Sequence, residues 1–301
     1  MTASAFLRLT RPRTLIAAFG PVCLAASFSH AILPAGVDGA LALERTLWIF
    51  LTVLFAQIAA NIWNEFFDFK SGLDIGQPTG NSGTITRDGI SPETVKRIGF
   101  AFTAAAGIAG LYASYLSTPL FIPIGLFCIA ISILYSTGPI PLSRTPFGDL
   151  ASGLTMGLAV NVLVVYAFTD RFLAEACITG VPSMLLIAAI LMTNNIRDIR
   201  NDAVHGRKTL AVVLGRNKAI AALRICLFGA LLWTIYFVSD ETFPVGALAS
   251  LIAVVPATKA IASLQSSDDV FVGDRAMSFT ATAVLTYHLV GGVTMLAGSF
   301  I

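Results

Sequence analysis

Long stretches without any Asp, Glu, Lys or Arg divide this chain into apolar segments of the length that a membrane-spanning helix needs. There are eight such stretches, and one of them, residues 98–143, is too long for a single crossing at 46 residues. Ser117-Thr118-Pro119 interrupts it near the middle, and this short polar break predicts two helices joined by a tight turn. The pattern therefore predicts nine transmembrane helices, at about residues 14–36, 46–69, 98–116, 119–137, 148–169, 174–198, 218–239, 242–262 and 277–299.

The composition agrees with a membrane protein. Hydrophobic residues make up 56% of the 301 residues and charged residues only 12%, about half of the ~25% that is typical of soluble domains. We therefore expect an all-α membrane protein with one domain over residues 1–301, folded as a helix bundle around a central cavity. The net charge of +2 gives no basic excess that would indicate a nucleic acid partner. The four cysteines lie far apart in apolar sequence, which is typical of small apolar filler.

The distribution of basic residues predicts the orientation. If the N-terminus is cytoplasmic, 16 of the 19 Lys and Arg residues lie inside, and only Arg45 and Arg171 lie outside. Arg224 then lies near an inner helix end, where its long side chain can reach the interface. We expect a multi-pass protein of the cell membrane with a cytoplasmic N-terminus and an external C-terminus. No small-residue cleavage site follows the first apolar run, so this run is interpreted as a retained helix.

The first polar cluster lies at the end of the second predicted helix. Its side chains are spaced i, i+3, i+4, i+7 and so share one helix face: Asn61, Asn64, Glu65 and Asp68. Asp74 follows just after Gly72, a residue type that commonly ends helices.

The second polar cluster lies at the end of the sixth predicted helix. Asn194, Asp198 and Asp202 are spaced i, i+4, i+8, with Asn195 and Asn201 beside them. Both helices are predicted to run from outside to inside, so the two clusters face the same side of the membrane.

Charges at helix ends often only mark the membrane boundary, but a polar stripe that recurs within membrane depth favours a functional site. Asn and Asp oxygens without His or Cys suit magnesium. The adjoining loops supply cations that suit a phosphate group: Lys70, Arg87, Arg197, Arg200, Arg207 and Lys208. Carboxylates, magnesium and basic side chains at a membrane surface together indicate a diphosphate site.

The two clusters resemble the motifs of the UbiA superfamily of intramembrane prenyltransferases. The first superfamily motif is Asn-Asp-x-x-Asp followed by a further Asp, and here it corresponds to Asn64-Glu65-Phe66-Phe67-Asp68 with Asp74. The second is Asp-x-x-x-Asp, which corresponds to Asp198 and Asp202. Glu65 keeps the charge where many members have Asp. Within the superfamily the chain is most similar to the 1,4-dihydroxy-2-naphthoate polyprenyltransferases of menaquinone biosynthesis, through residues 11–14, 72–74, 135–139, 145–149, 194–198 and 206–210.

The resemblance implies a magnesium-dependent transfer of a polyprenyl group from polyprenyl diphosphate to an aromatic acceptor, with 1,4-dihydroxy-2-naphthoate as the leading acceptor and loss of its carboxylate. The implied metal ligands for two magnesium ions are Asn64, Asp68 and Asp74 for one and Asp198 and Asp202 for the other. Asp68, Asp198 and Asp202 would be the catalytic residues. The implied diphosphate-binding residues are Lys70, Arg87, Tyr135, Arg207 and Lys208. Candidates for contact with the acceptor or for support of the ligands are Asn61, Glu65, Arg144, Asp149, Asn194 and Asn195.

Three alternatives keep some of these features. A superfamily member that prenylates another acceptor, or one that cyclises the prenyl diphosphate, would retain both aspartate motifs. An ion-coupled transporter would also carry carboxylates in membrane helices, but it would more often place them near the midplane than at inner helix ends.

Overall fold

The computed structural model describes residues 1–32, 36–72 and 83–298, and the regular elements in these ranges are all helical. The α-helices are α1 (Ala3–Thr10), α2 (Ile16–Ile32), α3 (Gly39–Lys70), α4 (Pro92–Leu116), α5 (Phe121–Ser136), α6 (Gly148–Ser152), α7 (Val160–Thr169), α8 (Ala176–Arg197), α9 (Ile199–Val204), α10 (Leu210–Leu214), α11 (Arg216–Ser239), α12 (Val254–Ser266) and α13 (Val270–Gly298). Short 3₁₀ or π segments are η1 (Pro12–Thr14), η2 (Leu142–Arg144), η3 (Gly153–Ala159) and η4 (Val245–Ala253).

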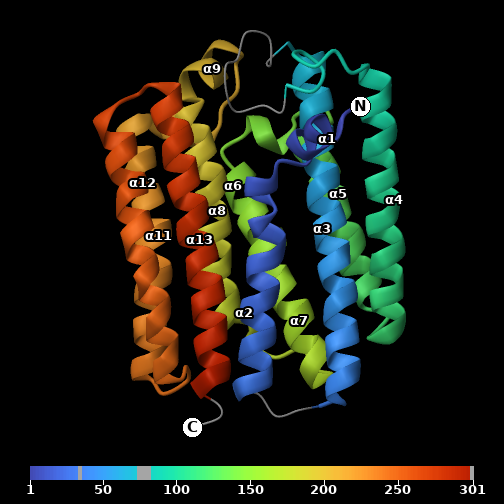
Figure 1. The fold of residues 1–301 in the computed structure, drawn as a ribbon, viewed down its shortest axis with the longest axis vertical. Coiled ribbons are helices and arrows are strands. Elements are labelled where there is room, and N and C mark those ends of the chain that lie inside the picture. Colours follow the sequence, from blue (N-terminus) through green and yellow to red (C-terminus); the bar gives the residue numbers. More distant parts are fainter. Residues whose placement is uncertain (33–35, 73–82, 299–301) are drawn as a thin grey trace.

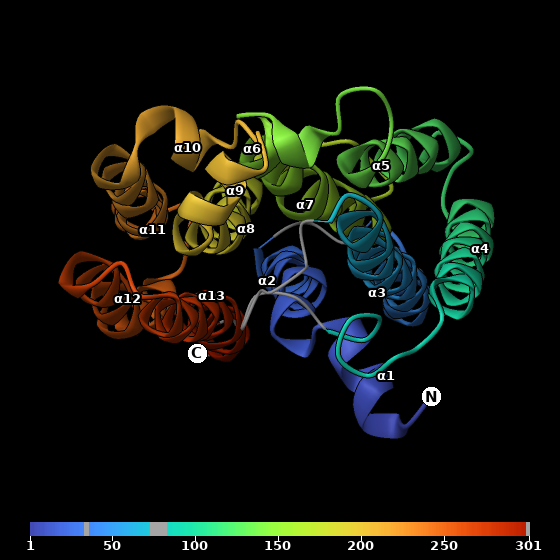
Figure 2. The same ribbon diagram turned by 90° about the horizontal axis from the view of Figure 1, so that it is seen from above.

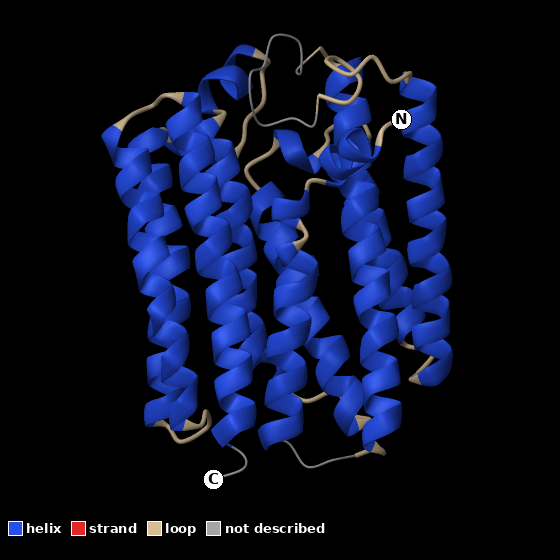
Figure 3. Cartoon of the chain, viewed as in Figure 1, coloured by secondary structure: helices blue, strands red, loops and turns tan. Residues whose placement is uncertain are grey.

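The long helices run side by side in one bundle (Figure 1). The short helices α1 and α9 lie at one end of this bundle, which we call the α9 end. Viewed from above, α11 and α12 lie at one rim of the bundle and α4 and α5 lie at the other, with α2, α3, α7 and α8 between them (Figure 2). Figure 3 shows that the described elements are helices joined by loops at both ends of the bundle.

Seven helical segments of the described chain are long and apolar enough to cross a membrane, which agrees with a polytopic membrane protein. They are Gly39–Lys70, Pro92–Leu116, Gly148–Thr169, Ala176–Arg197, Arg216–Ser239, Val245–Ser266 and Val270–Ala297. The segment from α1 to α2 is an eighth candidate, with a 48° bend between its two parts. The apolar helix α5 is shorter, at 16 residues.

Several predicted helix boundaries were wrong because charged residues extend the helices. Helix α3 begins at Gly39, well before predicted residue 46, where the Asp38 carboxylate accepts hydrogen bonds from the first-turn N–H groups. Arg45 is buried within α3 and pairs with Asp170 at 3.1 Å. Helix α4 likewise begins at Pro92, before predicted residue 98. The sequence prediction also missed α1, α9 and α10.

The bend between α1 and α2 is fixed against α3. Arg11 has a positive φ of 49°, which ends α1, and Pro12 begins η1. The Asn61 side-chain amide of α3 donates to the Thr10 carbonyl at 2.8 Å and to Thr14 Oγ1 at 2.9 Å. The bond to Thr10 satisfies a carbonyl at the end of α1, and together the two bonds hold Arg11 beside α3.

Candidate active site

A cavity of about 220 Å³ lies inside the bundle, between α3, α5, α7 and α8. Its wall in the depth of the bundle is mostly apolar, with Val53, Ile129, Leu163, Ile187 and Ile190 among the lining residues. Polar side chains gather on the remaining wall: Arg11, Asn61, Asn64, Asp68, Tyr135, Asn194, Asn195, Asp198, Asp202 and Arg207. The cavity therefore combines an apolar space with a charged end, as an amphiphilic substrate would require.

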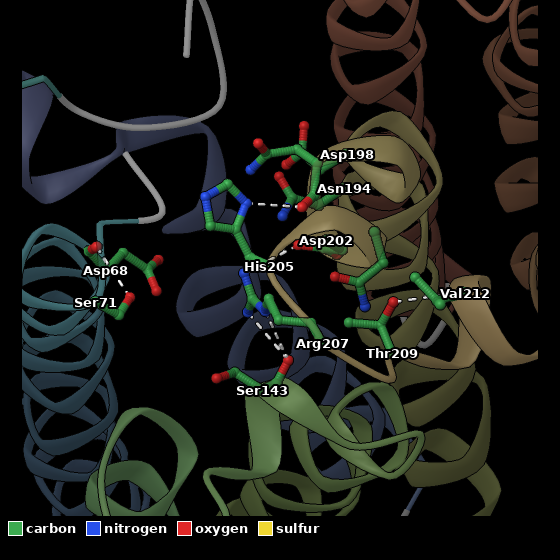
Figure 4. Close-up of polar contacts among 12 residues, drawn as sticks. Asp68, Ser71, Ser143, Asn194, Asp198, Asp202, His205, Arg207, Thr209 and Val212 are labelled. Atoms are coloured by element: carbon green, nitrogen blue, oxygen red, sulfur yellow. Dashed lines mark hydrogen bonds and ion pairs between the residues drawn. The ribbon is translucent and has the colours of Figure 1, made fainter. Parts of the chain in front are cut away.

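The two predicted polar clusters meet at this cavity from opposite sides. Figure 4 shows Asp68 on α3, across from Asp198, Asp202 and Arg207, which lie at the end of α8, in α9 and just after it. These residues are 130 or more positions apart in the sequence. The fold thus brings together the residues that the motif spacing predicted.

On the α3 side, Asn64 and Asp68 both line the cavity. They are four residues apart in an unbroken helix, so their side chains project from the same face. Within the described ranges, the Asp68 carboxylate forms neither a hydrogen bond nor an ion pair. Its oxygens therefore remain open to a ligand in the cavity.

On the α8 side, Arg197 holds the first carboxylate of the second motif. Its Nε and Nη2 donate to the two oxygens of Asp198 at 2.8 and 2.6 Å, and Nη2 also donates to Asn194 Oδ1 at 2.5 Å. The Arg197 side chain is only 3% exposed and lies 3.6 Å from Asp274 of α13. A Cβ at position 273 would lie 2.4 Å from Arg197 Cγ, so Gly273 is needed for this packing.

The second carboxylate of this motif pairs with a different cation. Arg207 Nη1 lies 3.2 Å from Asp202 Oδ1, and the same guanidinium donates to the Ser143 carbonyl. Asp202 Oδ2 is buried without a hydrogen-bond partner in the described chain. Burial raises the pKa of Asp202 to about 6, although Arg207 opposes the shift. Burial would lower the pKa of Arg207, but the combined attraction of Asp202, Asp68 and the other acidic groups nearby raises it.

Some other predicted site residues lie away from the cavity lining. Glu65 is 1% exposed, and its Oε1 accepts hydrogen bonds from the backbone N–H groups of Thr84 and Ile85. Its Oε2 lies 3.7 Å from Arg11. Glu65 thus joins α3 to the loop before α4, because its side chain points away from the cavity-lining face of the same helix.

Asn195 does line the cavity, and its side-chain amide donates to Asp149 Oδ1 at 2.8 Å. Asp149 is buried behind it and is not among the lining residues of the described chain. Asp149 therefore fixes the orientation of the Asn195 side chain.

The predicted basic residues are divided between the cavity and the surface. Arg207 and Tyr135 line the cavity. Lys70, Arg144 and Lys208 are exposed, and Arg87, which is 57% exposed, lies 3.6 Å from Asp88. Arg11 also lines the cavity, although the motif spacing did not predict it as a site residue. The signal in the sequence was its place in the segment 11–14.

The donor set suits a hard cation, but its members are not gathered into one coordination shell. Within the described residues, no three His, Cys, Asp or Glu side chains are close enough to hold one ion together. Asp74, the further predicted ligand, lies outside the described residues. The available donors are oxygens, and Asp202 Oδ2 is a buried oxygen without a partner. This chemistry fits magnesium.

Comparison with known proteins agrees with the geometry. The model of the UbiA prenyltransferase family matches residues 15–296, which is nearly the whole chain. The chain belongs to the UbiA prenyltransferase family. It is therefore an enzyme that transfers prenyl groups, and the cavity with its two aspartate motifs is the candidate active site of this UbiA prenyltransferase.

Similar enzymes in bacteria are curated as naphthoate prenyltransferases. The chain is 37% identical over 232 residues to the 1,4-dihydroxy-2-naphthoate octaprenyltransferase of Bacillus subtilis, which covers 76% of this chain and 71% of the relative. It is 32% identical over 214 residues to the enzyme of the same name from Mycobacterium tuberculosis, covering 68% of each chain.

Solved structures share the fold. A UbiA homologue from Aeropyrum pernix K1 superposes with a TM-score of 0.68 at 16% identity and covers 96% of this chain and 98% of its own. A UbiA homologue from Archaeoglobus fulgidus, solved with DMAPP and Mg²⁺, gives a TM-score of 0.55 at 18% identity and covers 96% and 99%. At these identities the likeness shows the UbiA fold.

Proposed function

We propose that this UbiA prenyltransferase transfers a polyprenyl group from polyprenyl diphosphate to 1,4-dihydroxy-2-naphthoate, with loss of the acceptor's carboxylate, in menaquinone biosynthesis. The observation that carries the proposal is the 37% identity to the Bacillus subtilis enzyme of that name. The cavity supports it, because both aspartate motifs line a space whose remaining wall is largely apolar.

Magnesium is the proposed cofactor, as two ions. Asn64, Asp68 and Asp74 would hold one ion, and Asp198 and Asp202 the other. Bound magnesium supplies charge that stabilises the departing diphosphate as the allylic C–O bond breaks. Arg197 orients the side chains of Asp198 and Asn194 through hydrogen bonds of 2.5 to 2.8 Å.

The protein's own cations complete the diphosphate site in this proposal. Arg207 and Arg11 both line the polar end of the cavity, where guanidinium groups can bind phosphate oxygens. The Tyr135 hydroxyl lines the same end. The exposed Lys70, Arg87 and Lys208 lie around that end of the bundle and would attract the incoming diphosphate.

The apolar part of the cavity would hold the start of the isoprenoid chain. Most side chains of this part, such as Val53, Leu163 and Ile187, are apolar and offer it no nucleophile, and Cys128, Ser132 and Thr155 also line the cavity. Such a wall also keeps water from an allylic cation, so that the ring carbon of the acceptor is the group that reacts.

For the membrane arrangement, we propose nine crossings, with α1–α2 and α5 added to the seven long apolar segments. The N-terminus and the active site would be cytoplasmic and the C-terminus external, in the cell membrane. The distribution of 16 basic residues to one side supports this orientation.

A product assay tests the proposed function. Purified protein receives magnesium, a polyprenyl diphosphate and 1,4-dihydroxy-2-naphthoate, and we expect a prenylated, decarboxylated naphthoquinol. Asp68→Ala and Asp198→Ala should each reduce turnover at least about 100-fold, since each removes charge that acts on the leaving diphosphate. Asp240→Asn, a change of an exposed aspartate at the end of α11, is the matched control and should retain activity.

The outcomes separate the alternatives. Release of pyrophosphate without the naphthoquinol would reject the acceptor and favour another acceptor or cyclisation. Magnesium-dependent turnover that survives both aspartate variants would reject the assigned metal site.

A further inference from the structure

A second pocket, of about 380 Å³, lies between the beginning of α11 and the end of α12. It shares no lining residue with the active-site cavity within the described chain. Helices α11 and α12 form one rim of the bundle, so this pocket lies at the perimeter of the protein (Figure 2). Its polar lining residues are Arg216, Asn217, Arg224, Gln265, Ser267 and Asp268.

Arg216 brings a positive charge to the pocket in a fixed position. Its guanidinium donates to three backbone carbonyls, those of Leu264 at 2.7 Å, Ser267 at 2.6 Å and Ile196 at 3.3 Å. These bonds join α11 to the ends of α8 and α12, and they orient the guanidinium. The carbonyl groups carry no formal charge, and Arg216 forms no ion pair with a carboxylate among the described residues.

Arg224 brings a second positive charge to the pocket and lies further along the membrane-spanning helix α11 than Arg216 does. It is exposed and lies eight residues after the first residue of α11, which places its Cα about 12 Å further along the helix. Because α11 is a membrane-spanning segment, an exposed guanidinium there is costly unless it reaches the interface or finds an anion. It has no acidic partner in the described ranges.

The acidic residue of the pocket does not neutralise these charges. Asp268 already contacts Arg200 Nη2 through its Oδ2. Two guanidinium groups and one carboxylate line the pocket, and that carboxylate is already paired with Arg200, so the pocket carries a net positive charge. The side-chain amides of Asn217 and Gln265 add neutral hydrogen-bond donors.

We propose that this pocket binds the phosphate group of an anionic phospholipid from the surrounding bilayer. The Arg224 guanidinium can bind phosphate oxygens through a pair of parallel hydrogen bonds, and Arg216, whose Nη2 already donates to two carbonyls, adds positive charge. Basic pockets between transmembrane helices are typical sites for anionic head groups. A lipid fits better than a soluble phosphate, because Arg224 and the exposed Ala221 place the pocket wall within the membrane-spanning part of α11. The acyl chains would then lie along the outer face of the helix pair.

The test uses the whole protein in a neutral detergent, with phosphatidylglycerol and phosphatidylcholine of matched acyl chains as probes. Native mass spectrometry gives the affinity of each lipid, and thermal unfolding gives its stabilising effect. We expect the wild-type protein to bind phosphatidylglycerol more tightly than phosphatidylcholine. Arg224→Gln should weaken phosphatidylglycerol binding about fivefold, because it removes one of the two cationic side chains that line the pocket.

Arg97→Gln is the matched control, because Arg97 is an exposed arginine near the beginning of another membrane helix, α4, with 80% of its side chain exposed. It should leave phosphatidylglycerol binding unchanged. The proposal would be overturned if both variants lost phosphatidylglycerol affinity equally, or if Arg224→Gln kept the wild-type affinity. It would also be overturned if the wild-type protein bound the two lipids equally well. Inorganic phosphate is the last arm: if it competes for the pocket as strongly as the lipid does, the ligand is a soluble phosphate and the lipid assignment is wrong. None of these measurements depends on prenyl transfer.

Discussion

At the scale of single residues, the burial of Asp202 has a consequence that depends on pH. Its Oδ2 has no hydrogen-bond partner in the described chain, and burial raises its pKa to about 6. The folded protein therefore holds a proton on Asp202 more tightly than an unfolded chain would. Above about pH 6 the carboxylate is charged at a full cost to stability, and this cost decreases as the pH falls from about 6 to the unfolded-state pKa of 3.8, below which it is gone.

This pKa predicts how magnesium affinity depends on pH. A cation must displace the proton from Asp202, so affinity should be constant above about pH 6 and should fall by up to tenfold per pH unit below it. Magnesium-dependent thermal shifts at several pH values measure this directly. Asp202→Asn should bind magnesium weakly and should lose the pH dependence in that range. An affinity that stays constant through pH 6 in the wild-type protein would show that Asp202 is not a ligand.

Glu65 gives a second prediction at this scale. It is buried and accepts hydrogen bonds from the N–H groups of Thr84 and Ile85, which are themselves buried. Glu65→Ala would leave these groups unsatisfied at a cost of about 1–3 kcal/mol each, so we expect a clear fall in melting temperature. Glu65→Gln keeps an acceptor oxygen, so its melting temperature should fall less than that of Glu65→Ala. If the two variants lose the same amount of stability, the negative charge of Glu65 beside Arg11, and not its hydrogen bonds, stabilises the fold.

The helix geometry explains why Asn64 and Asp68 of the first motif line the cavity whereas Glu65 does not. Successive residues of an α-helix are rotated by about 100°, so a face defined by i, i+3, i+4 and i+7 is wide. Asn64 and Asp68 lie toward one edge of that face and line the cavity, whereas Glu65 lies toward the other edge and meets Arg11. Which edge faces the cavity depends on how α1 and the loop before α4 pack, and the local sequence does not contain that information.

At the scale of helices, the approach of η3 to α8 positions the second motif. A Cβ on Gly157 would lie 2.5 Å from both the Cα and the N of Met184, and one on Gly153 would lie 2.6 Å from the Met184 carbonyl oxygen. These glycines let η3 pack against the backbone of α8, the helix that ends at Asn194, Asn195 and Arg197.

Gly157→Ala should therefore destabilise the protein. The obstacle is backbone, which cannot move aside as a flexible side chain can, so we expect a loss of about 1–3 kcal/mol and a lower melting temperature. Gly107→Ala in α4 is the control, because a Cβ there meets nothing within 4 Å. Alanine has a higher helix propensity than glycine, so the Gly107→Ala protein should be as stable as the wild type or slightly more stable. A Gly157→Ala protein as stable as the control would show that α8 is free to shift away from η3.

Helix boundaries were predicted well where the chain is apolar and poorly where charges are satisfied by distant partners. Helix α5 and the α6–α7 segment lie within about two residues of prediction. Helix α3 extends past Arg45 because Asp170, 125 residues away, and the Leu116 carbonyl bind its guanidinium. Helix α13 begins at Val270, before predicted residue 277, and includes Asp274, which pairs with Arg13 and Arg197. A pattern of charge-free runs cannot detect such pairs.

At the scale of the whole molecule, α1 lies at the α9 end of the bundle, and the last described turn of α13 lies at the opposite end (Figure 1). Seven long apolar segments, the bent α1–α2 segment and the short helix α5 would together make nine crossings. An odd number of crossings puts the termini on opposite sides of a membrane, whereas eight crossings would put them on the same side. Whether α5 crosses the membrane therefore determines whether residues near the two ends of the chain are accessible from opposite sides or from the same side.

Labelling of single cysteines answers that question. In a variant whose four native cysteines are replaced by alanine, Ala3→Cys lies in α1 and Ala297→Cys lies near the end of α13, and both positions are exposed. A membrane-impermeant maleimide added to intact cells should label position 297 and should label position 3 only after permeabilisation. Lys208→Cys, at the α9 end, should behave like position 3, and Phe172→Cys, between α7 and α8, should behave like position 297. If positions 3 and 297 are labelled from the same side, the number of crossings is even. If positions 3 and 208 are labelled in intact cells and position 297 is not, the number of crossings is odd as proposed, but the orientation is inverted and the active site faces outward.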